Sequence, residues 1–307
     1  MVLNLSTKIC GKVFKNPLVL ASGILGTEAE LLARVAKSGA GAVTTKSCGL
    51  LPREGHENPT VLAWEDGLIN AVGLTHPGVE QEVEEIKKLR RLLGETKIIA
   101  SFFGGTVKEF VQAAKKLASA EPDFLELNIS CPNTESEFGQ PFGVSVKDTF
   151  TVTRAVKKSV RIPIIVKLSP NVTDIKLIAK AAEDGGADVI SAINTLIGMV
   201  IDVESGKPIL TNKRGGISGP AIRPIAVRCV YDVVSSVKVP VIGIGGVTSG
   251  YDAIQMMMAG AKAVGIGSAV YYRGLKVFKK INEEIKEFMK KHNYQSITDF
   301  CGISHED

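Results

Sequence analysis

The stretch VPVIGIGGVTSGYDAIQMMMAGAKAVGIGSAV (239–270) contains the repeating unit from which the fold can be predicted. It begins with a short apolar run (239–246), continues with an amphipathic helical pattern (249–261) and ends with a second apolar run (263–270). Apolar runs without polar alternation are typical of strands that are buried on both faces of a parallel sheet. The stretch therefore predicts two parallel strands connected by a helix.

The same alternation of apolar runs and helical patterns extends over the whole chain of 307 residues. Apolar runs, each followed by a helical pattern, occupy residues 18–23, 42–47, 97–104, 124–130, 163–170, 188–195, 239–246 and 263–270. Eight such units predict an α/β fold of the (β/α)8 TIM-barrel type, with insertions after strands 2, 4 and 6. No linker divides the chain, so we expect one domain over residues 1–307. A doubly wound open sheet is the alternative.

Helix start signals agree with this division. Thr27, Thr106 and either Thr173 or Asp174 stand where the helices after strands 1, 3 and 5 begin. Their side-chain oxygens can accept hydrogen bonds from the first backbone N–H groups of a helix. We therefore expect these residues to be N-caps.

The composition is ordinary for a globular protein, with 45% apolar and 22% charged residues. The net charge of +5 is modest, and Lys and Arg are mixed with Glu along helical segments, which predicts solvated helix faces and no nucleic-acid binding. No apolar run reaches the roughly 20 residues that span a bilayer, and the N-terminus lacks the apolar core of a signal peptide. We expect a cytoplasmic protein without membrane contact.

The five cysteines are widely spaced and form no CxxC or CxxxxC pair. This pattern predicts no zinc site, no iron–sulfur cluster and no other metal in this chain, and it is typical of reduced thiols. We interpret Cys10, Cys229 and Cys301 as small buried apolar residues, and Cys48 as structural. Cys131 differs from these four by its setting.

In a (β/α)8 barrel the active site lies at the carboxyl ends of the strands. The predicted strand ends are polar and contain Ser22, Lys46-Ser47, Asn128-Ile129-Ser130-Cys131, Lys167, Asn194-Thr195, Gly245-Gly246 and Gly267-Ser268. Two lysines at strand ends are hard to explain by packing, because an unpaired buried charge costs several kcal/mol. The strand ends are therefore the candidate site.

Three glycine-rich turns predict a phosphate site. IGIGGVTSG (242–250) and VGIGSAV (264–270) end the last two strands, and GGISGPA (215–221) follows strand 6. Glycine lets the backbone approach a ligand closely, and phosphate sites after strands 7 and 8 are frequent in this fold. Tight turns in a compact barrel are the alternative. A Rossmann dinucleotide site is disfavoured by the position and spacing of these glycines.

The stretch LNISCPNT (127–134) places the thiol of Cys131 in a polar turn after strand 4. A thiol there can act as a nucleophile or as a base if nearby cations lower its pKa. No histidine is an obvious partner, since His56 and His76 lie in loops and His292 and His305 near the C-terminus. A cysteine base is therefore preferred to a Cys–His nucleophile.

These motifs resemble those of a known family. LNISCPNT, TTKS, INAVGL, IVKLSP, INTLIGM, GGISGPA, GIGGV and GIGSA occur in the order found in class 1 dihydroorotate dehydrogenases, and they cover essentially the whole chain. The form INTLIGMVID (193–202) is most similar to class 1B, the NAD-linked type. The resemblance implies oxidation of (S)-dihydroorotate to orotate in pyrimidine (UMP) synthesis, with one FMN in each chain.

The resemblance also implies roles for individual residues. Cys131 would remove a proton from carbon 5 of dihydroorotate while a hydride leaves carbon 6 for FMN. Substrate binding would involve Lys46, Asn70, Ala71, Val72, Gly73, Leu74, Asn128, Asn133, Asn194 and Thr195. Lys46 would favour the negative charge that develops, and Lys167 would stabilise the reduced flavin. Flavin-binding positions would be Ser22, Lys46, Ser47, Asn128, Lys167, Ile193, Gly219, Gly245, Gly246, Gly267 and Ser268.

By the same resemblance, the expected assembly is a homodimer of this chain with a second subunit that carries FAD and a 2Fe–2S cluster. The sequence departs from the family pattern at Ser101, where many relatives have asparagine within strand 3. This difference puts a flavin contact at that position in doubt. The position of loop 134–145 after Cys131 favours a lid that excludes water, with an ordinary surface loop as the alternative.

Other functions remain open from the sequence. One is a class 1A enzyme, a homodimer that uses fumarate, and another is a relative that acts on a different dihydropyrimidine. A non-catalytic flavin-binding electron-transfer subunit is disfavoured, because it would not need Cys131, Lys46 and the asparagines. A phosphate isomerase would be the interpretation if no flavin binds.

Overall fold

The fold is taken from a computed structural model that describes residues 3–130 and 142–306. Eight strands form a closed barrel in which every neighbouring pair is parallel. In ring order they are β3 (Leu18–Leu20), β4 (Ala42–Thr44), β7 (Lys97–Phe102), β8 (Phe124–Asn128), β9 (Ile164–Leu168), β10 (Val189–Ala192), β15 (Val241–Ile244) and β16 (Ala263–Ile266). The predicted barrel is confirmed, and the open sheet is excluded.

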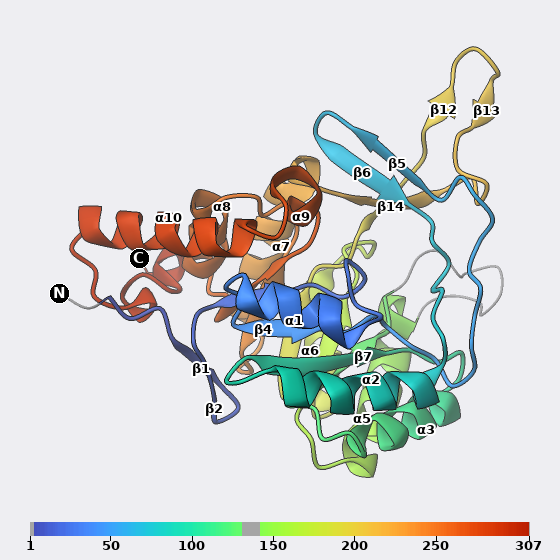
Figure 1. The fold of residues 1–307 in the computed structure, drawn as a ribbon, viewed down its shortest axis with the longest axis horizontal. Helices are drawn as coiled ribbons and strands as arrows, with labels where there is room; N and C mark the ends of the chain where they lie inside the picture. Colours follow the sequence, from blue (N-terminus) through green and yellow to red (C-terminus); the bar gives the residue numbers. More distant parts are fainter. Residues whose placement is uncertain (1–2, 131–141, 307) are drawn as a thin grey trace.

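A helix follows each barrel strand and covers the outside of the barrel (Figure 1). The helices are α1 (Ala29–Lys37), α2 (Val79–Leu92), α3 (Val107–Ala118), α5 (Val146–Ser159), α6 (Ile175–Asp184), α7 (Arg223–Ser236), α8 (Gly250–Met258), and α10 (Val277–Lys291), which is preceded by the short α9 (Ala269–Arg273). Short 3-10 turns occur at η2 (Phe142–Val144), η3 (Pro220–Ile222), η4 (Ile297–Asp299) and η5 (Ile303–His305).

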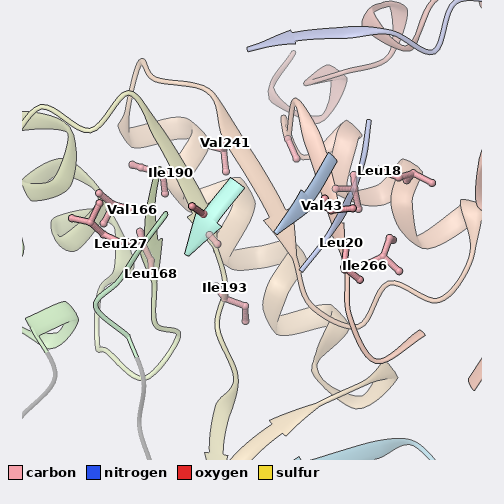
Figure 2. Packing of buried hydrophobic residues seen from close by; sticks show 14 of the residues in the cluster. Leu18, Leu20, Val43, Leu127, Val166, Leu168, Ile190, Ile193, Val241 and Ile266 are labelled. Carbon is pink, nitrogen blue, oxygen red and sulfur yellow. The ribbon is translucent and has the colours of Figure 1, made fainter. Parts of the chain in front are cut away.

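The barrel strands are buried on both faces, as their continuous apolar sequences predict. Alternate residues face the helices and form one large core, of which Figure 2 shows a part, including Leu18, Leu20, Val43, Val166 and Ile190. The intervening residues at the beginnings of the strands form a second cluster inside the barrel. The shell of helices and the filled interior therefore hold the strand ends in fixed positions.

The N-terminal hairpin closes one end of the barrel. Strands β1 (Thr7–Ile9) and β2 (Lys12–Phe14) pair in antiparallel fashion, and Ile9 and Phe14 belong to the interior cluster. Phe14 is fully buried, which contributes about 1.5–3 kcal/mol. The amino-terminal end of the barrel is therefore filled, and the carboxyl end remains for a ligand.

The insertions after strands 2 and 6 are confirmed, and they pair with each other. The first contains β5 (Val61–Trp64) and β6 (Gly67–Asn70), and the second contains β11 (Leu196–Gly198), β12 (Ile201–Asp202), β13 (Lys207–Pro208) and β14 (Gly215–Ser218). A four-stranded sheet in the order β11-β14-β6-β5 joins the two insertions, and the β12–β13 hairpin projects away from the barrel (Figure 1). Of the predicted loop 134–145, residues 134–141 lie outside the described residues.

Two of the predicted N-caps are confirmed. Thr106 accepts a hydrogen bond from Glu109 N, and Asp174 accepts one from Lys176 N. The expectation for Thr27 is wrong, because α1 has Glu28 at its N-cap position and no side-chain cap of its own. The N–H of Ala29 instead donates to Glu85 Oε2 at 2.7 Å. A carboxylate on the neighbouring helix α2 thus replaces the local cap.

The cysteines differ in part from the expectation. Cys48 and Cys229 are buried, and burial raises the pKa of both thiols. Cys301 is half-buried. Cys10 is exposed, which contradicts its interpretation as a buried apolar residue. It occupies the tight turn between β1 and β2 with φ 49°, so the turn geometry places its side chain at the surface.

Among the described residues, no helix is long and apolar enough to cross a membrane. The same residues contain no group of three or more His, Cys, Asp or Glu side chains that could hold a metal ion.

Candidate active site

A cavity of ≈ 390 Å³ opens at the carboxyl ends of the barrel strands. Strand ends form its floor, and residues of β5, β6 and β14 form part of its wall. The predicted site residues that line it are Ser22, Lys46, Ser47, Asn70, Val72, Gly73, Leu74, Asn128, Lys167, Ile193, Asn194, Thr195, Gly219, Gly245, Gly246, Gly267 and Ser268. Residues far apart in the sequence therefore meet in one cavity.

Among the described residues, one predicted site residue, Ala71, is not part of this lining. Ala71 packs against Ile69 and Leu210, and its N–H donates to Thr60 O at 2.8 Å, so it lies away from the cavity. Cys131 and Asn133 lie outside the described residues.

Two asparagines on the cavity floor are fixed by Ser130. Asn194 Nδ2 donates to Ser130 Oγ at 2.9 Å, and Ser130 Oγ lies 3.3 Å from Asn128 Oδ1. Asn194 Oδ1 also accepts from Thr195 N at 2.8 Å. Because both amides have partners inside the protein, their orientation is set before any ligand arrives.

A second set of contacts fixes the other side of Asn128. Its Nδ2 donates to Ser47 Oγ at 3.0 Å, and Ser47 Oγ lies 3.2 Å from Ser22 Oγ. Ser22 donates in turn to Thr45 O at 2.8 Å. The ends of β3, β4 and β8 are thus connected by side chains that line the cavity.

Two cations lie at the strand ends, as predicted. Lys167 is 6% exposed and lines the cavity, and within residues 3–130 and 142–306 its ammonium group has no ion-pair partner. A buried cation in this setting favours an anionic ligand. Lys46 is half-buried, and its positive charge affects the pKa of a neighbouring histidine. The pKa of His76 is lowered to about 4, first by burial and then by the charge of Lys46.

The glycine turn after β15 allows the chain to come close to its neighbours. Gly246 has φ 70°, and a Cβ atom on it would lie 2.6 Å from Arg223 Cβ. Gly245 has φ 134°, and a Cβ atom there would lie 2.5 Å from Ala226 Cβ. Side chains do not fit between this turn and α7 at either position, so the turn packs directly against that helix, and both glycines also line the cavity.

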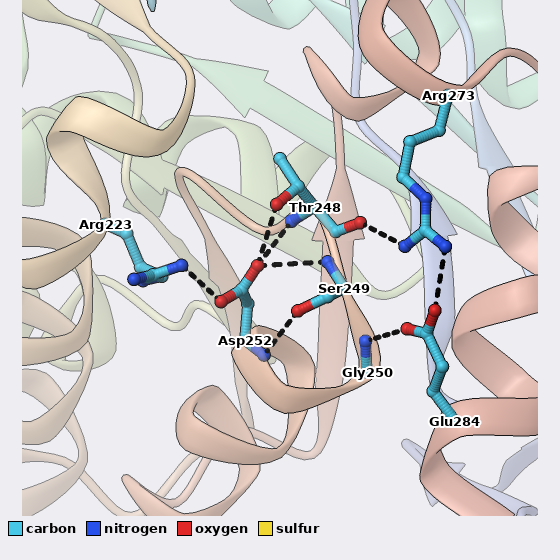
Figure 3. A network of polar contacts seen from close by, with 7 residues as sticks. All are labelled: Arg223, Thr248, Ser249, Gly250, Asp252, Arg273 and Glu284. Carbon is cyan, nitrogen blue, oxygen red and sulfur yellow. Dashed lines mark hydrogen bonds and ion pairs between the residues drawn. The ribbon is translucent and has the colours of Figure 1, made fainter. Parts of the chain in front are cut away.

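Polar contacts hold the segment after this turn, at the start of α8 (Figure 3). Asp252 is 2% exposed and accepts from the N–H groups of Thr248 and Ser249 at 2.9 and 3.0 Å. Arg223, at the start of α7, forms an ion pair with the same carboxylate. The start of α8 is therefore attached to α7.

Arg273 and Glu284 attach the same segment to the C-terminal helices (Figure 3). Arg273 donates to Thr248 O at 2.7 Å and pairs with Glu284 at 2.7 Å. Glu284 also accepts from Gly250 N. Fixing the segment from two sides keeps the neighbouring glycine turn in one conformation.

Ser101 does not reach the cavity. Its side chain is fully buried, and its hydroxyl lies 2.8 Å from Ser47 Oγ and 3.1 Å from Glu126 Oε1. The hydroxyl of Ser101, which stands where many relatives have asparagine, therefore forms its hydrogen bonds inside the barrel, one layer below the cavity floor.

Several residues of the site are not predicted from the sequence. Ser130 is predicted only as part of a strand end, although its spacing of two residues from Asn128 is a signal for a shared face. Asn171 is not among the predicted site residues, yet it donates to Thr195 O at 3.0 Å and accepts from Ile197 N at 2.9 Å. The apolar wall residues Ile24, Val61, Leu68, Val247 and Tyr271 carry no signal in the sequence, because the folding of the insertions and loops brings them to the cavity.

Comparison with known proteins gives consistent matches. A family model described as dihydroorotate dehydrogenase matches residues 4–289. A protein of Methanocaldococcus jannaschii, named dihydroorotate dehydrogenase B (NAD(+)), catalytic subunit, is 50% identical over 304 residues, which cover 98% of each chain. Proteins with the same name from Methanosarcina mazei and Pyrococcus abyssi are 48% and 46% identical, over 97% and 98% of this chain and 94% and 99% of theirs.

Proposed function

The chain belongs to the dihydroorotate dehydrogenase family, and on this premise we propose that it oxidises (S)-dihydroorotate to orotate in pyrimidine synthesis, as the FMN-containing catalytic subunit of an NAD-linked enzyme. The observation that carries the proposal is the cavity of ≈ 390 Å³ at the strand ends. It brings together the asparagines, lysines and glycine turns that the family resemblance assigns to substrate and flavin.

The residues present fit FMN. Gly245, Gly246 and Gly267 line the cavity after β15 and β16 and offer a phosphate a cradle without side chains. Lys167 offers a buried cation to the anionic reduced flavin. FMN, when bound, supplies the acceptor for the hydride that leaves carbon 6 of the substrate.

The substrate is a small ring that carries amide groups and a carboxylate. Asn70, Asn128 and Asn194 line the cavity and present donors and acceptors to such a ring edge. Asn70 Nδ2 also donates to Gly216 O at 3.3 Å, which couples the substrate side of the cavity to β14. Thr195 and the backbone of Val72, Gly73 and Leu74 complete this set.

In the proposed reaction, Cys131 takes the proton from carbon 5 of dihydroorotate. Cys131 directly follows Ser130 in the sequence, and Ser130 forms hydrogen bonds with Asn128 and Asn194 at the cavity floor. Lys46 lines the same cavity and favours the negative charge that develops as the proton leaves.

The relatives are named as catalytic subunits of an NAD(+) enzyme, which supports a partner subunit for this chain. We propose a homodimer of this chain, in the cytoplasm, with a partner that carries FAD and a 2Fe–2S cluster. The described residues contain no cluster-binding cysteine group. Electrons can reach a distant acceptor through such a partner, whereas hydride transfer to NAD would require direct contact with the flavin.

The test uses the purified full chain. Released flavin is identified by chromatography, and dihydroorotate oxidation is followed with a dye, with fumarate and with NAD as acceptors. The proposal expects FMN, fast dye reduction and slow NAD reduction that rises when the partner is added. Finding FAD or no flavin would contradict the cofactor assignment. Efficient fumarate reduction would instead identify a class 1A enzyme.

A further inference from the structure

Glu126 is a buried carboxylate inside the barrel to which the proposed reaction assigns no role. It lies on β8, two residues before Asn128 and therefore on the same inward face, and it is 3% exposed. Within the described residues it has no ion-pair partner. A buried charge without a cation depends on hydrogen bonds, because leaving it unsatisfied costs several kcal/mol.

Two buried serines supply these hydrogen bonds. Ser101 Oγ on β7 lies 3.1 Å from Glu126 Oε1, and Ser191 Oγ on β10 lies 3.2 Å from Oε2. Both serines are fully buried. A carboxylate can only accept, so each serine has to direct its single hydroxyl proton at Glu126.

This requirement sets the direction of the next hydrogen bond. Ser47 Oγ lies 2.8 Å from Ser101 Oγ, and the distance alone allows either atom to donate. Because the proton of Ser101 is directed at Glu126, Ser101 must accept and Ser47 must donate. Ser47 then offers only lone pairs to Asn128. Ser22 directs its own proton at Thr45 O and lies 3.2 Å from Ser47 Oγ, so it is a second and more distant acceptor for the Ser47 proton.

Asn128 is the residue that meets these lone pairs. Its Nδ2 lies 3.0 Å from Ser47 Oγ, and its Oδ1 faces Ser130, with 3.4 Å to Ser130 N and 3.3 Å to Ser130 Oγ. Rotating the amide by half a turn would place two acceptors, Oδ1 and Ser47 Oγ, against each other. The rotated amide would also place Nδ2 against the Ser130 N–H, so Ser130 excludes it from one side and the direction set at Glu126 excludes it from the other.

We propose that Glu126 is a positioning residue: acting through Ser101 and Ser47, it holds the Asn128 amide in one orientation toward the bound pyrimidine. This inference rests on the proposed function, because Asn128 is taken as a substrate-binding residue. It predicts that a change two hydrogen bonds away from Asn128 alters the affinity for the pyrimidine.

Two serine substitutions provide a matched test. Ser101→Ala and Ser191→Ala each remove one donor from Glu126 at a fully buried site, but only Ser101 lies on the path to Asn128. In FMN-loaded protein with measured flavin content, orotate binding is titrated by calorimetry. We expect the orotate Kd to rise about fivefold in Ser101→Ala, as for one lost hydrogen bond, and by less than about twofold in Ser191→Ala. Equal effects of the two variants would overturn the proposal.

Glu126→Gln tests whether the orientation of Asn128 depends on the direction of the hydrogen bonds at position 126 or on the negative charge of Glu126. The glutamine can turn its NH2 group to Ser191 and its carbonyl oxygen to Ser101, which preserves the path to Asn128. We expect its orotate Kd to stay within about twofold of the wild type, whereas a marked loss would show that the charge itself is needed and would overturn the proposal. Wild-type dihydroorotate oxidation is measured first. If it is absent, the proposed function fails, and if it is present while the two serine variants are alike, only the role of Glu126 fails.

Discussion

Asn194 and Ser130 are hydrogen-bonded at 2.9 Å although 64 positions separate them in the chain and β9 lies between their strands in the barrel. Side chains from alternate strands meet in the interior of such a barrel, which explains the contact. Ser130 also faces Asn128, so one hydroxyl holds two amides of the candidate substrate site. The positions of these amides thus depend on a residue that is not itself part of the cavity lining.

Ser130→Ala should weaken substrate binding more than turnover. Asn194 loses the acceptor for its amide, and a typical hydrogen bond contributes about 1 kcal/mol, or roughly fivefold in an equilibrium constant. Steady-state kinetics with a dye acceptor should show a raised KM for dihydroorotate and a similar kcat. Ser159→Ala, at the end of α5, is the control, because its hydroxyl bonds to Val156 O away from the cavity. An unchanged KM in Ser130→Ala would contradict the assignment.

Cys131→Ala should retain FMN and lose nearly all dihydroorotate oxidation, since a positioned base contributes about 10²–10⁴-fold. Cys131→Ser should keep a trace of activity that rises with pH, because a hydroxyl ionises far less readily than a thiol. Stopped-flow measurement of flavin reduction decides the matter. Near-normal reduction in the alanine variant would show that another group takes the proton.

Gly246→Ala should impair flavin binding. The new Cβ atom would approach Arg223 within 2.6 Å in a left-handed backbone, so the turn must move. Gly274→Ala is the matched control, because Gly274 also has a positive φ, of 63°, but an added Cβ meets nothing within 4 Å. Both variants should lose about 1–2 kcal/mol of stability from backbone strain. We expect only Gly246→Ala to lose FMN during dialysis, and equal retention would argue against the phosphate cradle.

The stability of the protein should fall as the pH rises from 6.5 to 8. Burial raises the pKa of Glu82 on α2 from 4.5 to about 8. The folded state then holds a proton that the unfolded state has released, so the free energy of unfolding falls by up to about 1.4 kcal/mol per pH unit. His76 acts in the opposite sense, since its pKa is lowered from 6.5 to about 4 and it opposes folding only below pH 6.5.

Urea unfolding at several pH values between 6.5 and 8 measures this effect. Glu82→Gln should flatten the curve and be more stable than the wild type at pH 8. Glu84→Gln, on the same helix with a side chain that is 71% exposed, should leave the slope unchanged. A wild-type slope retained in Glu82→Gln would show that another group is responsible.

The sequence by itself determined the barrel, the order of its strands and most of the cavity. Strand runs such as 163–170 are continuously apolar because both of their faces are buried, and this pattern is local. The carboxyl ends of parallel strands meet at one end of a barrel, so the polar residues at these ends could be placed together without coordinates. The glycine pair after β15 and the single Gly267 after β16 could be placed at the site for the same reason.

Only the tertiary structure decided how these residues are held. The cap of α1 comes from Glu85 on another helix, the wall of the cavity comes from two insertions that pair through β6 and β14, and Ser101 turns out to face Glu126 rather than the cavity. Each of these contacts joins residues distant in the chain, and a pattern of neighbouring residues carries no information on such pairs. The packing of α1 against α2, the pairing of the two insertions and the register of β7 against β8 bring these groups together, and all three are set by the folded arrangement of the elements.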